Sequence, residues 1–464
     1  MNRHWRPLCL VAVLAACGAG GQTQGPTPAA SADATSLDRP QYPSTYARRD
    51  YPPVMIQNAT ILTATGEEIE QGSILFRDGR IVAIGRRVEA PSDAIVVDGT
   101  GKFVTPGLID THSHLGVYAA PGTDAESDGN EAVNPNTGYV WAEHAFWPQD
   151  PQIPLAIAGG VTTIQVLPGS ANLFGGRGAT LRLVPARSVQ EMKFPDAPHG
   201  LKMACGENPK RVYGNRGGPQ TRMGNMAGYR AGFIAAERYR RDMERWERTR
   251  QGQPPLRDLR NETLAGVLAG TILVQNHCYR ADEMLLMLDL AREFGFRIRS
   301  FHHGVEAYKI ADHLAAAGTA ASVWADWWGF KEEAMDGILE NAALVEQAGA
   351  RAVIHSDSPD GIQRLNQEAA KAMWAGRRAG LTVTRNQALR WITANPAWVL
   401  GIDGVTGTLE TGKAADVVLW SGDPFSVYSR AEQVYNDGWL VYDRNDPSRQ
   451  PRMDFELGQV RRPQ

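Results

Sequence analysis

One segment of the sequence is more informative than any other: Thr105-Pro106-Gly107-Leu108-Ile109-Asp110-Thr111-His112-Ser113-His114. It has the pattern of an apolar strand that ends in two histidines at positions i and i+2. Side chains two residues apart on a strand lie on the same face, so His112 and His114 can converge on one metal ion. A His-x-His pair alone is a weak signal, but its place directly after an apolar strand makes it stronger. The segment predicts a histidine pair that binds metal at the end of a buried strand.

Outward from this segment, the chain alternates short apolar runs with helical patterns. The runs are residues 161–167, 201–205, 271–276, 298–301, 321–324 and 352–354, and helical patterns at 281–294, 307–317, 332–348 and 363–380 separate most of them. Such alternation is typical of parallel βα units. At this length we predict an α/β fold with a (β/α)8, TIM-type barrel over residues 105–401.

Further metal-ligand types stand at the ends of these predicted strands. His277 directly follows one apolar run, His302 and His303 follow another, and Asp357 comes shortly after a third. In a (β/α)8 barrel, the carboxyl ends of the strands form the face that carries the active site. Each histidine alone could be structural, but together they predict a metal site on that face.

The two ends of the chain have a different, all-β texture. Residues 51–104 hold short β-rich runs with an Asp78-Gly79 hairpin signal, and residues 402–464 hold more, with a turn at Asn436-Asp437-Gly438. We therefore predict one small β-sandwich domain assembled from both ends, 51–104 as its first part and 402–464 as its second part and tail.

The N-terminus has the features of an export signal. Basic residues precede a short apolar run that ends in Leu14-Ala15-Ala16-Cys17. That ending resembles the lipobox of bacterial lipoproteins, so residues 1–17 are predicted to be a lipoprotein signal peptide, with Cys17 lipidated and residues 18–50 a flexible tether. Gly18 favours anchoring on the periplasmic side of the outer membrane. The alternative is an ordinary signal peptide cleaved near Ala16.

Composition excludes several classes of protein. The 464 residues carry a formal net charge of −3, which argues against a nucleic-acid partner, and 43% are hydrophobic, which argues against wholesale disorder. Four cysteines are too few for a disulfide-dense scaffold. Only Cys205 and Cys278 lie in the expected folded part, and we expect two buried free thiols, with a disulfide as the alternative.

Together, these motifs resemble those of the amidohydrolase superfamily. The resemblance is carried by 107–114, by Gly160-Val161-Thr162-Thr163, by Asn395-Pro396-Ala397 and by the closing segment 407–416. It is nearest to the imidazolonepropionase-like branch and covers residues 54–442. The resemblance implies one or two divalent metal ions, zinc being the expected metal. It further implies that His112 and His114 hold the buried metal, that His277 and His303 hold the second, and that Asp357 is both ligand and general acid/base.

Two ligand assignments have alternatives. The family's bridging ligand is usually a carboxylated lysine and in some branches a glutamate. Lys202 lies inside an apolar run, where an ammonium ion without a partner is costly, so we favour carboxylated Lys202 over Glu207. His303 is chosen over His302 because it precedes Gly304, although alternation along a strand cannot decide between the two. His303 is also a candidate to stabilise the oxyanion, and His355 is a candidate neighbour of the ligands.

The predicted activity is hydrolysis of a C–N bond in an amide, cyclic amide or dipeptide. A metal-activated water would attack, with Asp357 moving the proton. Polar residues just beyond strand ends are candidates for substrate binding: Tyr279, Arg280, Tyr308, Lys210 and Arg211. The alternatives are an aminohydrolase (deaminase) and an inactive, lipid-anchored binding protein. Expected partners are a small amide or short peptide and the membrane, with a homo-oligomer left open.

Overall fold

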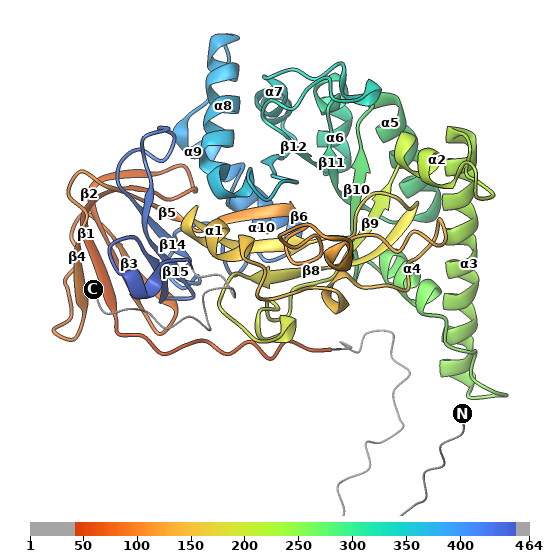
Figure 1. Cartoon of the computed structure of the whole chain (residues 1–464), viewed down its shortest axis with the longest axis horizontal. Helices are drawn as coiled ribbons and strands as arrows, with labels where there is room; N and C mark the ends of the chain where they lie inside the picture. Colours follow the sequence, from red (N-terminus) through yellow and green to blue (C-terminus); the bar gives the residue numbers. More distant parts are fainter. Residues whose placement is uncertain (1–41, 452–464) are drawn as a thin grey trace, which may run out of the picture. The chain divides into compact units, whose positions relative to one another are not determined.

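The structure is a computed structural model that describes residues 42–451 (Figure 1). The predicted signal peptide, Cys17, most of the predicted tether and residues 452–464 lie outside the described residues. Within the described residues the strands form two eight-stranded sheets. One is the barrel sheet that positions the candidate site, and the other is built from both ends of the described chain.

The barrel sheet follows the chain in order from its first strand to its last. Its strands are β6 (Leu108–Ser113), β7 (Val161–Val166), β8 (Phe174–Arg182), β9 (Gly200–Ala204), β10 (Leu273–Cys278), β11 (Ile298–His303), β12 (Ala320–Val323) and β13 (Ala352–Ile354). The residues of β6 and β7 are all buried, and the other strands are nearly so, as expected for a sheet covered on both faces. The prediction of an α/β fold with an eight-stranded barrel sheet is confirmed.

Strand β8 departs from the predicted all-parallel arrangement. It pairs antiparallel with both β7 and β9, whereas the other neighbours in the barrel sheet are parallel. The connection from β7 to β8, residues 167–173, is shorter than the dozen or so residues that a parallel crossover needs. The glycine-rich segment 175–178, which looks like a loop in the sequence, lies inside this strand.

The barrel is nearly closed, and a short backbone segment lies at the seam between β6 and β13. The amide of Ile109 in β6 donates to the carbonyl of Ile392 at 2.9 Å, and the amide of Ile354 in β13 donates to Trp391 at 2.9 Å. Residues 391–392 therefore bond to both edge strands in place of direct pairing. Beyond the seam, the amide of Asp357 donates to the carbonyl of His112 at 3.1 Å, which brings the two chain segments of the candidate site together.

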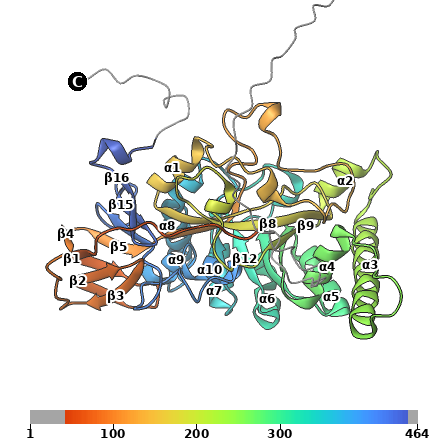
Figure 2. The same cartoon turned by 90° about the horizontal axis from the view of Figure 1, so that it is seen from below.

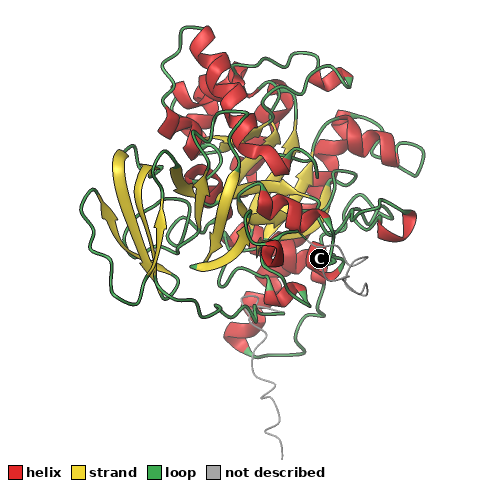
Figure 3. Cartoon of the chain, turned by 60° about the vertical axis from the view of Figure 1, so that its left-hand side comes forward, coloured by secondary structure: helices red, strands yellow, loops and turns green. Residues whose placement is uncertain are grey.

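Helices surround the barrel strands, as Figure 3 shows by colour. The α-helices are α1 (Gln152–Ala158), α2 (Glu207–Tyr213), α3 (Arg222–Thr249), α4 (Leu259–Ala269), α5 (Ala281–Phe294), α6 (Ala311–Ala317), α7 (Asn341–Gln347), α8 (Leu365–Arg378), α9 (Arg385–Arg390) and α10 (Ala394–Leu400). Short 3-10 turns are η1 (Asp124–Glu126), η2 (Ala142–His144), η3 (Val189–Glu191), η4 (Ala307–Ile310), η5 (Glu332–Ala334), η6 (Ile362–Arg364) and η7 (Pro447–Arg449). Helix α5 has the bounds that its apolar periodicity predicts.

The second sheet joins strands from both ends of the described chain (Figure 2). Its strands are β1 (Val54–Leu62), β2 (Glu68–Arg77), β3 (Arg80–Gly85), β4 (Ile95–Asp98), β5 (Phe103–Pro106), β14 (Val417–Trp420), β15 (Ala431–Asn436) and β16 (Trp439–Asp443). Strand β1 pairs with β2 on one side and with β4 and then β5 on the other, while β14 pairs with β5. The predicted sandwich is therefore a single branched sheet around its own core, and its origin from both ends agrees with the prediction.

Two Asp-Gly turns close hairpins in this sheet. Asp78 and Gly79 have φ of 50° and 75° between β2 and β3, and Asp437 and Gly438 have φ of 50° and 79° between β15 and β16. Two-residue hairpins favour turns with positive φ at both positions, which Asp-Gly tolerates. Both turns predicted from the sequence are confirmed.

Cys205 and Cys278 form a disulfide, with their Cα atoms 5.2 Å apart. The expectation of two free thiols is therefore wrong. The two residues stand at neighbouring ends of β9 and β10, where the amide of Cys205 donates to the carbonyl of His277. The sequence gives a separation along the chain but no distance in space, so it could not settle the pairing.

Candidate metal centre

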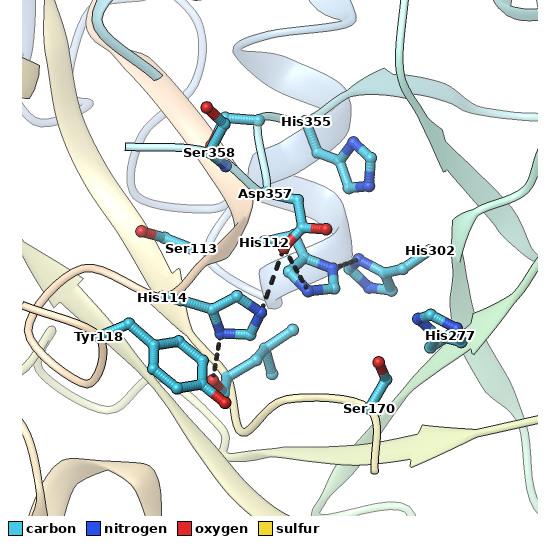
Figure 4. A network of polar contacts seen from close by, with 12 residues as sticks. His112, Ser113, His114, Tyr118, Ser170, His277, His302, His355, Asp357 and Ser358 are labelled. Atoms are coloured by element: carbon cyan, nitrogen blue, oxygen red, sulfur yellow. Dashed lines mark hydrogen bonds and ion pairs between the residues drawn. The ribbon is translucent and has the colours of Figure 1, made fainter. Parts of the chain in front are cut away.

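The histidine pair of β6 meets the carboxylate that follows β13 (Figure 4). The Nε2 atom of His114 lies 3.2 Å from Asp357 Oδ1, and the Nε2 atom of His112 lies 3.6 Å from the same oxygen. His112 is fully buried, while His114 and Asp357 are partly exposed. These three residues form one of two groups in the described chain that could hold a metal ion.

Hydrogen bonds on the far side of the His114 ring determine which nitrogen faces the centre. Its Nδ1 lies 2.9 Å from the carbonyl oxygen of Leu167, which can only accept, so Nδ1 carries the proton. The Nε2 lone pair of His114 is therefore free on the side of Asp357. A ligating histidine commonly donates its second nitrogen to a carbonyl in this way.

A longer chain of hydrogen bonds orients His112. The side-chain amide of Gln275, in β10, makes two contacts. Its oxygen Oε1 lies 2.8 Å from Nε2 of His302, and its own nitrogen donates to the carbonyl of Val399 at 3.4 Å. His302 Nε2 must then carry a proton, and His302 Nδ1 accepts from His112 Nδ1 at 3.0 Å. This Gln275–His302–His112 relay leaves the Nε2 lone pair of His112 directed at the centre.

Three potential ligand atoms thus converge. With the tautomers set by Leu167 and by the relay, His112 Nε2, His114 Nε2 and an ionised Asp357 each offer a lone pair to the same small volume. The lone pairs of His114 Nε2 and Asp357 face each other unfavourably unless a cation lies there or His114 takes a second proton, whereas His112 Nε2 can also accept from Lys202 Nζ at 3.1 Å. Two neutral imidazoles and a carboxylate are a donor set that suits zinc, so these residues fit the metal that the sequence predicts.

Asp110 holds the two halves of the centre in place. Its carboxylate accepts from the amide of His112 at 3.0 Å, from the amide of Ser356 at 3.2 Å and from the Ser356 hydroxyl. It therefore ties the end of β6 to the segment that carries Asp357. Burial raises the pKa of Asp110 to about 7. The sequence pattern contains Asp110 but gives no sign of this positioning role, because Ser356 is distant along the chain.

Lys202 lies beside the histidine pair. Its Nζ is 3.1 Å from His112 Nε2 and donates to the carbonyl of Pro168 at 2.9 Å, and its side chain is almost fully buried. Burial lowers the pKa of Lys202 to about 7, so a large fraction of the amine is uncharged at neutral pH. The other candidate, Glu207, begins α2 and forms an ion pair with Lys331 at 3.4 Å. The structure brings Lys202, rather than Glu207, to the cluster.

His302 and His303 both reach the interior from β11, which regular strand alternation would not allow. His303 has a φ of 73°, so the chain leaves the strand geometry there and turns its imidazole inward. The rings of His302 and His303 lie 4.8 Å and 4.7 Å from that of His112. The relay occupies both nitrogens of His302, whereas His303 Nδ1 lies 3.8 Å from Asp357 Oδ2. This geometry favours His303 as the ligand.

The second potential metal group consists of His112, His303 and His355. His355 Nε2 lies 3.0 Å from His303 Nδ1, which makes His355 a closer participant than the sequence suggested. His277, predicted as a ligand of a second metal, is outside both groups, but its ring lies 4.5 Å from that of His303. Its buried Nδ1 has no hydrogen-bond partner among the described residues.

Burial controls the ionisation of this cluster. Loss of water, with a smaller contribution from Lys202, holds the pKa of His112 well below its ordinary value, and burial has the same effect on His277, His302 and His303. For Asp357, burial opposes ionisation, but the hydrogen bond and charge of His114 outweigh it and lower the pKa of the carboxyl. Neutral imidazoles next to an ionised carboxylate are the protonation states that metal binding requires.

Of the five predicted substrate-binding residues, the structure brings Tyr279 to the cluster. Its buried ring stacks on His303 at 5.3 Å and meets His277 edge-on at 4.9 Å. This position follows from β10, because His277 lies near its end and Tyr279 directly follows its last residue. Lys331, which the sequence analysis missed, lies with its Nζ 3.8 Å from the centre of the Tyr279 ring.

The other four predicted substrate-binding residues are engaged elsewhere or face solvent. Arg280 pairs with its neighbour Asp282 at 2.9 Å, and the Tyr308 hydroxyl donates to a backbone carbonyl of the loop before α7. Lys210 is half-buried and Arg211 exposed on α2, and neither forms an ion pair in the described part of the chain. Proximity to a strand end was too coarse a signal, because loops beyond the first residue can turn in any direction.

The barrel is nearly closed, and imidazole and carboxylate groups converge at the ends of its strands. These features place the protein in the class of α/β barrels with a potential metal centre. Comparison with known proteins gives the family. The model of the amidohydrolase family matches residues 309–442. A crystal structure of an amidohydrolase from Thermotoga maritima is 38% identical, covers 84% of this chain and all of that one, and superposes with a TM-score of 0.78. The chain belongs to the amidohydrolase family.

Two curated relatives extend the comparison. Amidohydrolase tasK of Hapsidospora irregularis is 32% identical over 84% of this chain, which spans only 43% of the length of that relative. An imidazolonepropionase of Mesorhizobium japonicum is 26% identical over 80% of this chain and 90% of its own length. Both similarities agree with the resemblance seen in the sequence motifs.

Proposed function

We propose that this protein is a zinc-dependent hydrolase that cleaves a C–N bond in a small amide, cyclic amide or dipeptide. The observation that carries the proposal is the convergence of His112 Nε2, His114 Nε2 and Asp357 Oδ1 on one small volume. Membership of the amidohydrolase family and the imidazolonepropionase relative support the choice of bond.

Six residues would hold one or two ions: His112, His114, Lys202, His277, His303 and Asp357. A divalent ion bound there supplies Lewis-acid activation of water and of a carbonyl oxygen. The protein supplies the remaining elements. Its contribution is a donor set fixed in orientation by Leu167, by the Gln275–His302–His112 relay and by Asp110.

Asp357 is the proposed general acid/base. Its lowered pKa keeps the carboxylate ionised at neutral pH, so Oδ2 can accept a proton from the attacking water and return it to the leaving amine. His303, 3.8 Å from that oxygen, is placed to donate to the developing oxyanion.

Lys202 is proposed to be carboxylated. Its uncharged amine attacks carbon dioxide, an N–C bond forms, and one proton leaves the nitrogen, which yields a carbamate anion. The lowered pKa supports this step because only the neutral amine has the lone pair for it. The product would also remove the cost of a buried ammonium ion.

The test combines metal content with an activity panel. Protein lacking residues 1–17 is expressed in metal-replete medium, analysed for divalent metals, and assayed on cyclic amides, dipeptides and N-acyl amino acids. We expect close to one or two equivalents of metal, and less than about 0.2 equivalents would contradict the proposal. His112→Ala should lose metal and activity together. The matched control is His313→Ala, an exposed histidine of α6, which should lose neither.

We also propose that the protein is exported and anchored by lipid at Cys17. The lipobox-like segment and the Cys205–Cys278 disulfide, which suits an oxidising compartment, support this. In the part of the chain that the structure describes, none of the helices has the length and hydropathy to span a membrane. Cys17→Ser should move the protein from the membrane fraction to the soluble fraction, and retention through a salt wash would contradict the anchor.

A further inference from the structure

The loop after β12 exposes an unusual amount of apolar surface. Five large hydrophobic side chains with high exposure fall within residues 327–339: Trp327, Trp328, Phe330, Met335 and Leu339. Single exposed hydrophobic residues are common, but a contiguous group of them marks a binding surface. In Figure 1 this stretch lies between β12 and α7. We call residues 324–339 the aromatic loop.

The aromatic loop is continuous with the candidate metal centre. Trp324 is buried and stacks on His303 with 4.3 Å between ring centres. On its other side Trp324 stacks on Trp327 at 4.9 Å, and it meets Phe330 edge-on at 5.6 Å. A line of rings thus runs from His303 through a buried tryptophan to two rings that are 40% and 53% exposed.

The exposed rings also form a corner. Trp327 and Phe330 face each other edge-on, with 6.1 Å between centres and 87° between planes. A hollow bounded by His303, Trp324, Trp327 and Ile338 opens beside Trp327, and Phe330 stands outside its lining. A corner of two perpendicular rings gives a flat guest one face to stack on and one edge to contact, which is the geometry that aromatic pairs prefer.

The one cation of the aromatic loop, Lys331, is already paired, whereas exposed Glu332 forms no ion pair among the described residues, so the loop does not favour an anionic guest. The ammonium of Lys331 is shared between Glu207 at 3.4 Å and Glu333 at 3.5 Å, and Asp326 pairs with Lys371 at 3.0 Å. A substrate carboxylate would compete with two protein carboxylates for Lys331. An apolar group would displace water from the rings without breaking an ion pair.

We propose that Trp327 and Phe330 form a specificity subsite that holds a neutral aromatic group of the substrate next to the scissile bond. This inference rests on the proposed function, which it deepens by naming a substrate class: amides whose acyl or amine part carries an aromatic ring. Trp324 is the shared wall between this subsite and His303.

The test measures binding separately from turnover. Three neutral probes are titrated by calorimetry: N-acetyl-L-phenylalaninamide, N-benzoylglycinamide and N-acetylglycinamide, the last without a ring. The protein carries Asp357→Asn so that probe is not consumed, and chromatography checks that the probe stays intact. We expect at least one aromatic probe to bind ten or more times more tightly than N-acetylglycinamide. Trp327→Ala and Phe330→Ala should each weaken that binding about fivefold, as for loss of one ring contact.

The matched control is Trp374→Ala, which removes a half-exposed tryptophan of α8 outside the loop and should change none of these affinities. The proposal is overturned if the parent binds no aromatic probe, if it does not prefer the ring, or if Trp327→Ala and Phe330→Ala change the oligomeric state but not the affinities. If the Asp357→Asn protein prefers probes with a ring but the protein with Asp357 intact hydrolyses none of the substrates, the proposed hydrolase is refuted and the subsite stands. Hydrolysis without ring preference would do the reverse.

Discussion

Replacing Gln275 by leucine tests whether the relay behind His112 sets the tautomer of a metal ligand. Gln275 Oε1 is the acceptor, at 2.8 Å, for the Nε2 proton of fully buried His302. Without it, the buried N–H has no partner, which costs about 1–3 kcal/mol of stability. His302 can avoid that cost by moving its proton to Nδ1, but His112 Nδ1 must then accept, and the proton of His112 moves to Nε2. That atom then offers no lone pair to a metal.

The expected result is a loss of zinc affinity of about 10- to 100-fold, the usual effect of removing a partner that orients a ligand. Zinc affinity is measured by competition with a fluorescent chelator, and stability by urea unfolding of the metal-free protein.

The matched control is Gln165→Leu. Gln165 is equally buried, on β7 of the same barrel, and its amide has no hydrogen-bond partner among the described residues. This control should keep its zinc affinity and lose no stability. If Gln275→Leu loses stability but binds zinc within twofold of the parent, the relay does not control the tautomer of His112.

Three further predictions concern proton transfer, pH and the disulfide. Asp357→Asn keeps a coordinating oxygen but cannot accept a proton, so the protein should fold and retain much of its metal while kcat falls at least about 10²-fold; near-parental turnover would assign the proton transfer to another group. The metal-free protein should lose stability on acidification, because the buried histidines have a lowered pKa in the folded state and a pKa of about 6.5 in the unfolded chain. Below pH 6.5 the unfolded chain therefore binds more protons, and the free energy of unfolding falls by about 1.4 kcal/mol per pH unit for each histidine. The raised pKa of Asp110 opposes this loss in part. Urea midpoints at pH 7.5, 6.5 and 5.5 measure this, and a flat profile would contradict it. The Cys205→Ala/Cys278→Ala double variant should lose about 4 kcal/mol in urea unfolding, because the disulfide closes a loop across 73 residues; an unchanged midpoint would show that the bridge does not constrain the unfolded chain.

Much of the barrel and of the cluster of potential ligands could be predicted from the sequence, for a local reason. Strand runs and helix patterns follow from periodicity in neighbouring residues, and the bounds of α5 match its pattern. His112 and His114 share a face because side chains alternate along a strand. Since parallel strands end at the same edge, ligand types at strand ends could be expected to meet, and Asp357 does contact both histidines.

Contacts between distant segments were decided only by the tertiary structure. Strand β8 is glycine-rich and looks like a loop, and it becomes a strand because β7 and β9 offer hydrogen-bonding edges on both sides. The Cys205–Cys278 bridge depends on the register of β9 and β10. The inward turn of both His302 and His303 depends on a positive φ at one residue, which alternation cannot anticipate.

The sequence by itself therefore determined which residues could carry chemistry and at which edge of the barrel they stand. The tertiary structure decided which nitrogen of His112 and of His114 faces the centre, because Gln275 and Leu167 act on these rings from another strand and a loop. It also decided that Trp324 stacks on His303 and Trp327 on Trp324. Periodicity reports the face on which a side chain lies, whereas a hydrogen bond or a ring contact also requires a partner, and that partner is supplied by a part of the chain that local sequence does not specify.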